Sequence, residues 1–283
     1  MDKNIGIIGY GSMGKMFLNK FIESKTIQES NIFISNRTFE KIINLDKTYS
    51  KLNICKNNID VVKNAKILFI CVKPLEIKNV LTEIVEYLGA NIHIISLNGS
   101  VLFNQIEKIC INKKISKIIP SITAEVNQSV TLVCHNANVN VKDKEAINNL
   151  LKCFGTIMEI PEPEMGMGSE LTSCMPGFIG AIFKVITEEA VKHTSIPREK
   201  IIEMVIATMY GTGKLLLEKE MTYDTLINRV ATKGGITEEG TKIIENKLPE
   251  IIEEMFIKTL EKRRITTEKA NNEFNISLYA APQ

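Results

Sequence analysis

Three glycines near the N-terminus, spaced Gly-x-Gly-x-x-Gly, constrain the fold of this chain more than any other feature. They follow an apolar run, Ile5 to Ile8, that is typical of a buried parallel strand, and they precede apolar residues at helical spacing. In this context the spacing indicates dinucleotide binding, with the pyrophosphate at the helix N-terminus. The alternative is a glycine turn that binds nothing. The residues expected to contact the dinucleotide here are Gly9, Tyr10, Gly11, Ser12, Met13 and Gly14.

A second apolar run, residues 32–35, ends about 20 residues after the last of these glycines, where an NAD enzyme usually carries an acid for the ribose hydroxyls. The chain instead offers Ser35, Asn36 and Arg37. With no acid nearby to repel a 2′-phosphate, and a guanidinium that can pair with one, we expect NADPH rather than NADH. The alternative is that Arg37 is a solvated loop residue.

Further strands are expected at 53–55 (short and central), 67–72, 92–96 and 115–119, with an outer strand at 130–134 and a last helix end and strand at 150–160. The carboxyl ends of parallel strands face the cofactor in such sheets. Val72, Lys73 and Pro74 end the fourth run, so we expect them near the nicotinamide or ribose. A lysine at a strand end is equally often a surface residue.

The pattern changes at Pro161-Glu162-Pro163-Glu164, which reads as a linker. The expected fold class is α/β: a Rossmann-type dinucleotide-binding domain over residues 1–161, then an all-helical dimerisation and substrate domain over 162–283. Helices are expected over 171–193 (with a break at Pro176-Gly177), 197–220 and 224–230, followed by two more up to 264. Apolar positions on the first helix favour a homodimer or higher homo-oligomer through this region.

Composition excludes several classes of function. The net charge of +2 gives no reason to expect nucleic acid or a membrane surface as a partner. No apolar run reaches the roughly 18 residues of a membrane span, and no signal peptide is visible, so we expect a cytoplasmic protein. The six cysteines lack a C-x-x-C pair and the three histidines lie far apart, so we expect no metal site.

Over nearly its full length the chain resembles the pyrroline-5-carboxylate reductase family. The matching segments occur in family order: Gly9 to Gly14, Ser35 to Thr38, Val72-Lys73-Pro74, Lys117 to Ala124, Glu170 to Phe178 and Lys233-Gly234-Gly235-Ile236-Thr237. The last segment is the most specific. The resemblance implies a Rossmann domain, an interlocked helical dimer domain and NADPH-dependent reduction of a cyclic imine, pyrroline-5-carboxylate, to L-proline.

Three segments depart from the family pattern. They are Ile119 to Thr123, Thr172 to Phe178 and Thr232-Lys233. These departures resemble the late-competence ComER branch of the same superfamily, above all at Pro120 to Thr123 and Lys233-Gly234-Gly235. A dinucleotide-binding regulatory protein that has lost the reaction is therefore one alternative. Another is a reductase of a different carbonyl or imine, like the related hydroxyacid dehydrogenases. Their catalytic lysine has only Lys184 and Lys192 as candidates here, and neither lies in a known motif.

Substrate binding is expected at the late glycine pair. Backbone N–H groups of Gly234, Gly235 and Ile236 suit a carboxylate just before a helix N-terminus. The Thr237 hydroxyl is expected to bind the ring nitrogen and to serve as the catalytic group; the alternative is an ordinary helix cap. Glu170 is expected to be a solvated acid of a first helical turn.

Overall fold

The computed structural model describes residues 4–274, and they divide into two compact units. The sheet unit comprises the residues up to Cys174 together with those from Leu260 onward. The helical unit comprises Met175–Thr259. The predicted boundary at residue 161 lies 13 residues earlier and takes no account of the returning C-terminal segment. As a domain boundary it remains a prediction.

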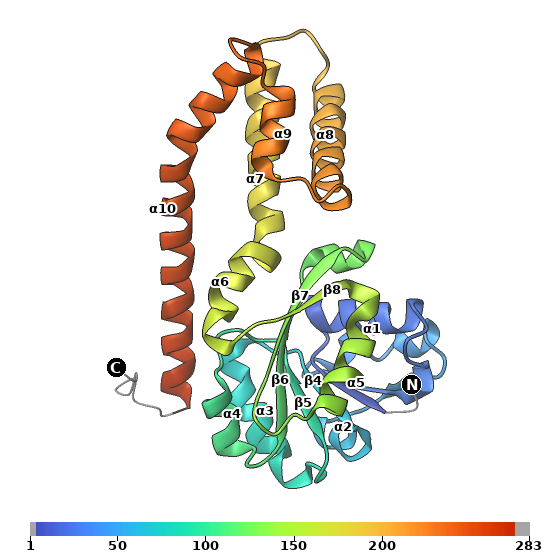
Figure 1. The fold of residues 1–283 in the computed structure, drawn as a ribbon. Coiled ribbons are helices and arrows are strands. Elements are labelled where there is room, and N and C mark those ends of the chain that lie inside the picture. Colours follow the sequence, from blue (N-terminus) through green and yellow to red (C-terminus); the bar gives the residue numbers. More distant parts are fainter. Residues whose placement is uncertain (1–3, 275–283) are drawn as a thin grey trace, which may run out of the picture. The chain divides into compact units, whose positions relative to one another are not determined.

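The sheet unit is built on one eight-stranded sheet, ordered β3-β2-β1-β4-β5-β6-β7-β8, in which β6 and β7 alone pair antiparallel (Figure 1). This confirms the α/β class. The strand predicted to be central, β3, lies at the edge instead, because the chain recrosses β1 to form β4 on its other side. The strands are β1 (Ile5–Ile8), β2 (Ile32–Ser35), β3 (Asn53–Ile54), β4 (Ile67–Ile70), β5 (His93–Ser96), β6 (Lys114–Ile119), β7 (Ser129–His135) and β8 (Gly155–Glu159).

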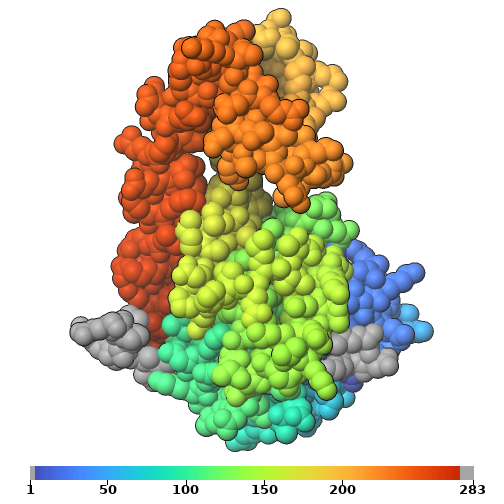
Figure 2. Space-filling model, viewed as in Figure 1, coloured from blue at the N-terminus to red at the C-terminus, as the bar shows by residue number. Residues whose placement is uncertain are grey.

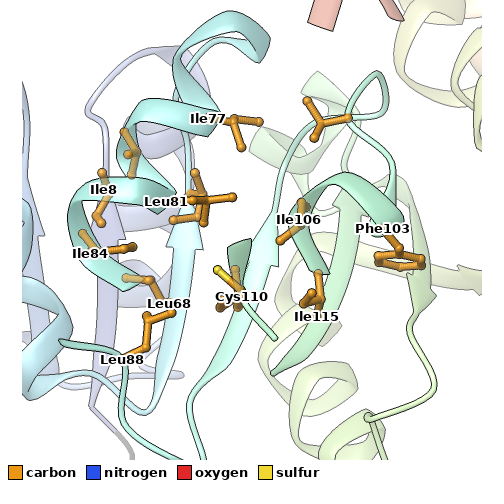
Figure 3. Packing of buried hydrophobic residues seen from close by; sticks show 14 of the residues in the cluster. Ile8, Leu68, Ile77, Leu81, Ile84, Leu88, Phe103, Ile106, Cys110 and Ile115 are labelled. Atoms are coloured by element: carbon orange, nitrogen blue, oxygen red, sulfur yellow. The ribbon is translucent and has the colours of Figure 1, made fainter. Parts of the chain in front are cut away.

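Helices cover both faces of this sheet, and alternate strand residues supply the two cores. On one face Leu68 and Ile70 of β4 pack under α2 (Asn58–Asn64), α3 (Ile77–Ile84) and α4 (Phe103–Ile109), as Figure 3 shows in part. On the other face Ile67 and Phe69 pack under α1 (Ser12–Glu23) and α5 (Val141–Leu151). The first, second and fourth strands are thereby buried on both sides, which explains their unbroken apolar runs.

The second core contains a cluster of four fully buried phenylalanines. Ring centroids of Phe17 and Phe21, which lie one turn apart on α1, are 5.6 Å from each other. Phe69 of β4 and Phe154 lie 5.1 and 4.7 Å from Phe17. Tilted and edge-on pairs at such distances stabilise beyond their buried area. The cluster fixes α1, and with it the glycine turn that precedes this helix.

The chain leaves the sheet through α6 (Met165–Ser169) and a π-helical turn, Glu170–Cys174, and it returns in α10 (Ile236–Glu273). The last residues of α10 pack on the sheet unit: Ala270 and Phe274 join its first core, and the Gln105 side chain donates to Asn271. Figure 2 shows this red segment lying against green segments of the sheet unit. Packing therefore assigns the C-terminal segment to the sheet unit.

The helical unit contains α7 (Met175–Val191), α8 (Arg198–Glu218), α9 (Tyr223–Val230) and the first part of α10. Two expectations about helix breaks meet different outcomes here. At Pro176 the helix does not end but changes type: the π-helical turn Glu170–Cys174 runs directly into α7, so the interruption expected at Pro176-Gly177 is a change of hydrogen-bond pattern rather than a gap. Pro249 does not divide α10 into two helices: a single α-helix runs from Ile236 to Glu273. None of the described helices is long and apolar enough to cross a membrane.

Candidate functional site

The glycine turn after β1 has a geometry that requires glycine at two positions. Gly9 has a φ of +102°, and its N–H donates to the Ser35 carbonyl at 2.9 Å. A Cβ at Gly14 would lie 2.0 Å from the Gly9 carbonyl oxygen, so only glycine lets α1 pack this close to the turn. Gly11, the N-cap of α1, faces open space. The backbone at this helix start is therefore accessible to an anion.

A pocket with a volume of about 530 Å³ opens beside this turn, at the carboxyl ends of β1 to β4. Eight of the predicted cofactor residues line it: Gly9, Tyr10, Gly11, Ser35, Asn36, Arg37, Val72 and Lys73. Ser12, Met13, Gly14 and Pro74 are not among the lining residues; they lie in the first turn of α1 and in the short helix Pro74–Glu76. The structure thus brings together most of the three segments that the sequence singled out.

Ser35 and Asn36 shape the pocket through hydrogen bonds within the protein. Asn36 accepts from the Tyr10 N–H at 2.8 Å, which ties the end of β2 to the glycine turn. The Ser35 hydroxyl, which is buried, donates to Asn58 Oδ1 at 2.7 Å, and Asn58 in turn donates to Glu83 at 2.7 Å. Asn58 and Glu83 were missed from the sequence, since no motif links the start of α2 or the end of α3 to a pocket.

An acid does lie near Arg37, contrary to the expectation from its neighbours in the sequence. Its guanidinium forms an ion pair with Glu76, which lies 39 residues later in the short helix Pro74–Glu76 that follows β4. The expectation rested on the residues next to Arg37 in the sequence, whereas the acid comes from another strand exit. The Arg37 side chain remains 83% exposed, so the guanidinium can still reach a ligand.

The Cys71 thiol lies at the end of β4, among the residues that line the pocket. Burial raises its pKa far above the usual range, so the thiol stays protonated and is a poor nucleophile. Lys73, two residues later, is exposed. The pocket therefore offers binding groups rather than a nucleophile.

The predicted substrate residues lie in the helical unit, in a separate body from this pocket. Gly234 has a φ of +75°, and its N–H donates to the Glu238 carboxylate at 2.5 Å. The Gly235 N–H donates to the Thr232 carbonyl at 2.8 Å. Two of the expected donors are thus used within the turn. Ile236 and Thr237 begin α10, where the first N–H groups of a helix lack helical acceptors, and both residues are exposed.

Glu170 differs from its predicted solvated state. Its side chain is 2% exposed, and one carboxylate oxygen accepts from Arg263 Nε at 3.2 Å and Nη2 at 2.8 Å. The pair joins the π-helical turn to the returning part of α10, a contact across 93 residues that local pattern cannot reveal. Lys184 of α7 and Lys192, just after its end, pair with glutamates of α7 and are exposed, as ordinary surface lysines are.

No group of three or more histidine, cysteine, aspartate or glutamate side chains within residues 4–274 is arranged to hold a metal ion. All six cysteines are free thiols.

An eight-stranded, mostly parallel sheet with a glycine turn opening onto a pocket at its strand ends defines a Rossmann-type dinucleotide-binding protein. The family models agree: residues 4–99 match "NADP oxidoreductase coenzyme F420-dependent" and residues 162–265 match "Pyrroline-5-carboxylate reductase dimerisation". The chain belongs to the pyrroline-5-carboxylate reductase family. It is 35% identical to pyrroline-5-carboxylate reductase 3 of Bacillus subtilis over 273 residues, which cover 96% of this chain and 99% of that protein.

The late-competence branch is also represented among the relatives. ComE operon protein 4 of Bacillus subtilis is 30% identical over 272 residues, again covering 96% of this chain and 99% of that protein. The fold agrees with solved structures. A pyrroline-5-carboxylate reductase from Coxiella burnetii aligns with a TM-score of 0.82 at 24% identity, covering 96% of this chain and 99% of that one. Pyrroline carboxylate reductase of Plasmodium falciparum with NADP bound gives 0.79 at 22%, covering 96% and 98%.

Proposed function

We propose that this protein reduces a cyclic imine with NADPH, and that the imine is pyrroline-5-carboxylate, which becomes L-proline. The proposal is carried by one observation: a dinucleotide pocket with a guanidinium at the end of β2, in a chain that aligns end to end with a pyrroline-5-carboxylate reductase. The protein is accordingly an NADP-dependent oxidoreductase acting on C=N bonds.

The pocket residues fit NADPH on physical grounds. The open face of Gly11 and the start of α1 suit the pyrophosphate, with Ser12, Met13 and Gly14 forming the first turn behind it. Arg37 suits the 2′-phosphate, held at the mouth by a loop that Asn36 ties to Tyr10. Val72, Lys73 and Pro74 follow β4 and suit the nicotinamide ribose. Bound NADPH supplies the hydride.

The protein's own part in the reduction is to hold the imine and its proton. We assign the carboxylate of the substrate to the late glycine turn, with the exposed helix start at Ile236 and Thr237 as its donors. The Thr237 hydroxyl accepts from the protonated ring nitrogen and orients the C=N bond. The nitrogen keeps this proton when its carbon gains the hydride, so the product is a secondary amine and NADPH leaves as NADP⁺. Positioning supplies most of the acceleration.

The test is NADPH oxidation by the full chain with pyrroline-5-carboxylate, alongside a panel of other cyclic imines and keto acids. We expect turnover with pyrroline-5-carboxylate. Thr237→Ala should lower kcat at least tenfold, about 1.4 kcal/mol, while the NADPH dissociation constant stays unchanged. Thr237→Ser, which keeps the hydroxyl, is the matched control and should retain turnover. Equal activity in all three proteins would exclude the assigned role of Thr237.

Glycine substitutions test the carboxylate assignment separately. Gly235→Val should abolish turnover while NADPH still binds. Because a Cβ at this position would lie 2.8 Å from the Thr232 carbonyl oxygen, this variant also disturbs the turn itself, and a milder variant is needed beside it. Gly234→Ala is the milder variant, because its Cβ meets nothing within 4 Å and only the positive φ is strained. An unchanged KM for the imine in both variants would remove the glycine turn from the proposal.

A second candidate is a dinucleotide-binding regulatory protein, favoured by the similarity to ComE operon protein 4. The segments that depart from the reductases carry bulky apolar residues, among them Ile122, which is 56% exposed. Tight NADPH binding with no oxidation by any imine or keto acid of the panel would favour this candidate.

The dimerisation-model match supports a homo-oligomer, and we propose a homodimer through the helical unit. We propose no nucleic-acid partner, because the net charge of +2 gives no basic surplus to bind one. Free thiols at all six cysteines support a reducing, cytoplasmic setting.

A further inference from the structure

The pocket carries more charge than the sequence motifs suggested. Four basic and two acidic side chains line it: Arg37, Lys41, Lys56, Lys73, Glu76 and Glu83. The surplus of positive charge suits an anionic ligand, yet the two acids mean that this charge is partly compensated before any ligand arrives. The positions of Glu76 and Glu83 therefore determine which of the basic side chains are left to bind a phosphate of the ligand.

Lys56 follows the strand next to the one that precedes Arg37, and it lines the same pocket. In the parallel pair of β2 and β3, Ile34 lies opposite Ile54, and the Cys55 N–H donates to the Ile34 carbonyl at 2.8 Å. Continuing this register brings Lys56 level with Asn36, one residue before Arg37. Arg37 and Lys56 thus follow the ends of two neighbouring strands, and both line the pocket.

Lys41 adds a third cation on the β2 side of the pocket. It lies in the short helix Phe39–Lys41, which directly follows the loop of Arg37. Lys41 and Lys56 are both exposed, and neither side chain forms a hydrogen bond or ion pair with another residue of the described chain. Arg37, by contrast, is paired with Glu76, which comes from the β4 side. One cation is thus engaged and two are free.

We propose that the 2′-phosphate of the dinucleotide is bound by an exchange of charge partners. Lys41 and Lys56 attract the phosphate, and Arg37 releases Glu76 to pair with it; the inference rests on the NADPH binding proposed above. Lys41 and Lys56 thus raise the affinity for 2′-phosphorylated nucleotides, whereas Glu76 lowers it by holding Arg37 in the free protein.

The relative strengths of the two contacts favour this exchange. An exposed ion pair such as Arg37–Glu76 is weak, because water screens it and two long side chains must be ordered. A phosphate carries nearly twice the charge of a carboxylate and binds a guanidinium bidentately. A nucleotide without the 2′-phosphate offers Arg37 no such partner, so Arg37 stays on Glu76. Glu76 should therefore affect only ligands that carry the phosphate.

The experiment measures binding of 2′,5′-ADP and 5′-AMP to the full chain by titration calorimetry at low salt. These ligands share adenine and ribose and differ in the 2′-phosphate. Glu76→Gln should tighten 2′,5′-ADP about three- to fivefold, and Lys56→Gln should weaken it about fivefold, with 5′-AMP unchanged in both. Glu86→Gln and Lys47→Gln, exposed residues that do not line the pocket, make the same charge changes and should alter neither ligand. Both effects should shrink at 0.5 M salt.

Three results would overturn the exchange. The first is 2′,5′-ADP binding that Glu76→Gln leaves unchanged or weakens. The second is an equal change for both nucleotides, which would make Glu76 a structural residue of the turn Pro74–Glu76. The third is no effect of Lys56→Gln. None of these depends on imine turnover. A protein that binds 2′,5′-ADP as described but reduces no imine would refute the proposed reaction and leave the exchange standing.

Discussion

The two units bury their apolar residues to very different extents. In the sheet unit the strands β1 and β4 are buried at every position. In the helical unit the only apolar side chain buried among the described residues is Ile201. Three isoleucines on α7, Ile179, Ile182 and Ile186, are 38%, 39% and 39% exposed. Both units are rich in apolar residues. They differ in burial because helices cover both faces of the sheet, whereas no further layer of the described residues covers these isoleucines of α7.

The comparison indicates how each unit is stabilised. A sheet with helices on both faces completes its own core. Three helices and part of a fourth that leave a row of isoleucines exposed do not, and such a surface needs a second apolar surface to cover it. Stability of the sheet unit should therefore depend on internal packing, and stability of the helical unit on association.

The largest expected effect is the loss of a phenylalanine from the sheet unit. Phe17→Ala should lower the free energy of unfolding by about 3–5 kcal/mol, because it removes the ring that contacts Phe21, Phe69 and Phe154 and leaves a cavity. Urea unfolding followed by circular dichroism measures the change. Leu217→Ala in the helical unit, where the side chain is 81% exposed, is the control and should change stability by less than about 0.5 kcal/mol. Similar losses in both variants would contradict the comparison.

The next effect concerns assembly. Ile182→Arg combined with Ile186→Arg places two charges on the exposed apolar face of α7, which should raise the dissociation constant of the oligomer at least about 100-fold, roughly 2.7 kcal/mol. Light scattering across a concentration series measures it. Glu188→Arg, a change to the same residue type at a polar position of α7, is the control and should leave the mass unchanged. An assembly that both variants preserve would place the interface elsewhere.

A smaller effect is expected at the mouth of the pocket. Arg37→Ala should raise the dissociation constant of NADPH by an amount equivalent to about 1.5–3 kcal/mol, because a charge-assisted contact with the 2′-phosphate is lost. Fluorescence titration with NADPH, and with NADH as the ligand that lacks the phosphate, measures the change. NADH affinity should stay nearly constant. An NADPH dissociation constant that does not move would disprove the cofactor assignment of Arg37.

The difference in burial between the sheet unit and the helical unit also explains which features could be predicted from the sequence. Strands buried on both faces appear as unbroken apolar runs, and the glycine turn has a spacing that few other structures need, so the sheet and one wall of its pocket were predictable. Helix continuity was less predictable: Pro176-Gly177 marks only a change from π-helix to α-helix, and the two helices expected before residue 264 are one helix, α10, with Pro249 inside it.

Contacts between distant segments were not predictable, because they depend on which strand ends meet. Glu76 at Arg37, Glu83 at Asn58 and Arg263 at Glu170 are separated by 39, 25 and 93 residues. Each changes the state expected for its partner: a free guanidinium proves to be paired, and a solvated acid proves to be buried. Local pattern indicates which residues are candidates, whereas the fold decides which charges they meet.

The smallest expected effect is a pH dependence, and it lies in the sheet unit. His135, at the end of β7, accepts or donates a hydrogen bond at Nδ1 with the Ser116 hydroxyl at 2.6 Å, while its Nε2 is buried without a hydrogen-bond partner. Burial lowers the pKa of His135 below 6.5; Glu159 opposes this shift and Lys144 reinforces it. His193, beyond the end of α7 in the helical unit, is exposed. Acid should therefore act on the sheet unit through His135.

The sign follows from the two pKa values. Below pH 6.5 the unfolded chain binds a proton at His135 that the folded protein resists, so the free energy of unfolding falls as the pH falls from 6.5 towards the lower folded pKa. The slope cannot exceed about 1.4 kcal/mol per pH unit for one proton. His135→Asn, which keeps a polar group for Ser116 but does not titrate, should flatten this part of the profile. His193→Gln, at an exposed position outside the sheet unit, is the matched control. Urea unfolding at pH 5, 6 and 7 measures the slopes, and a parallel loss in wild type and His135→Asn would assign the acid sensitivity to other groups.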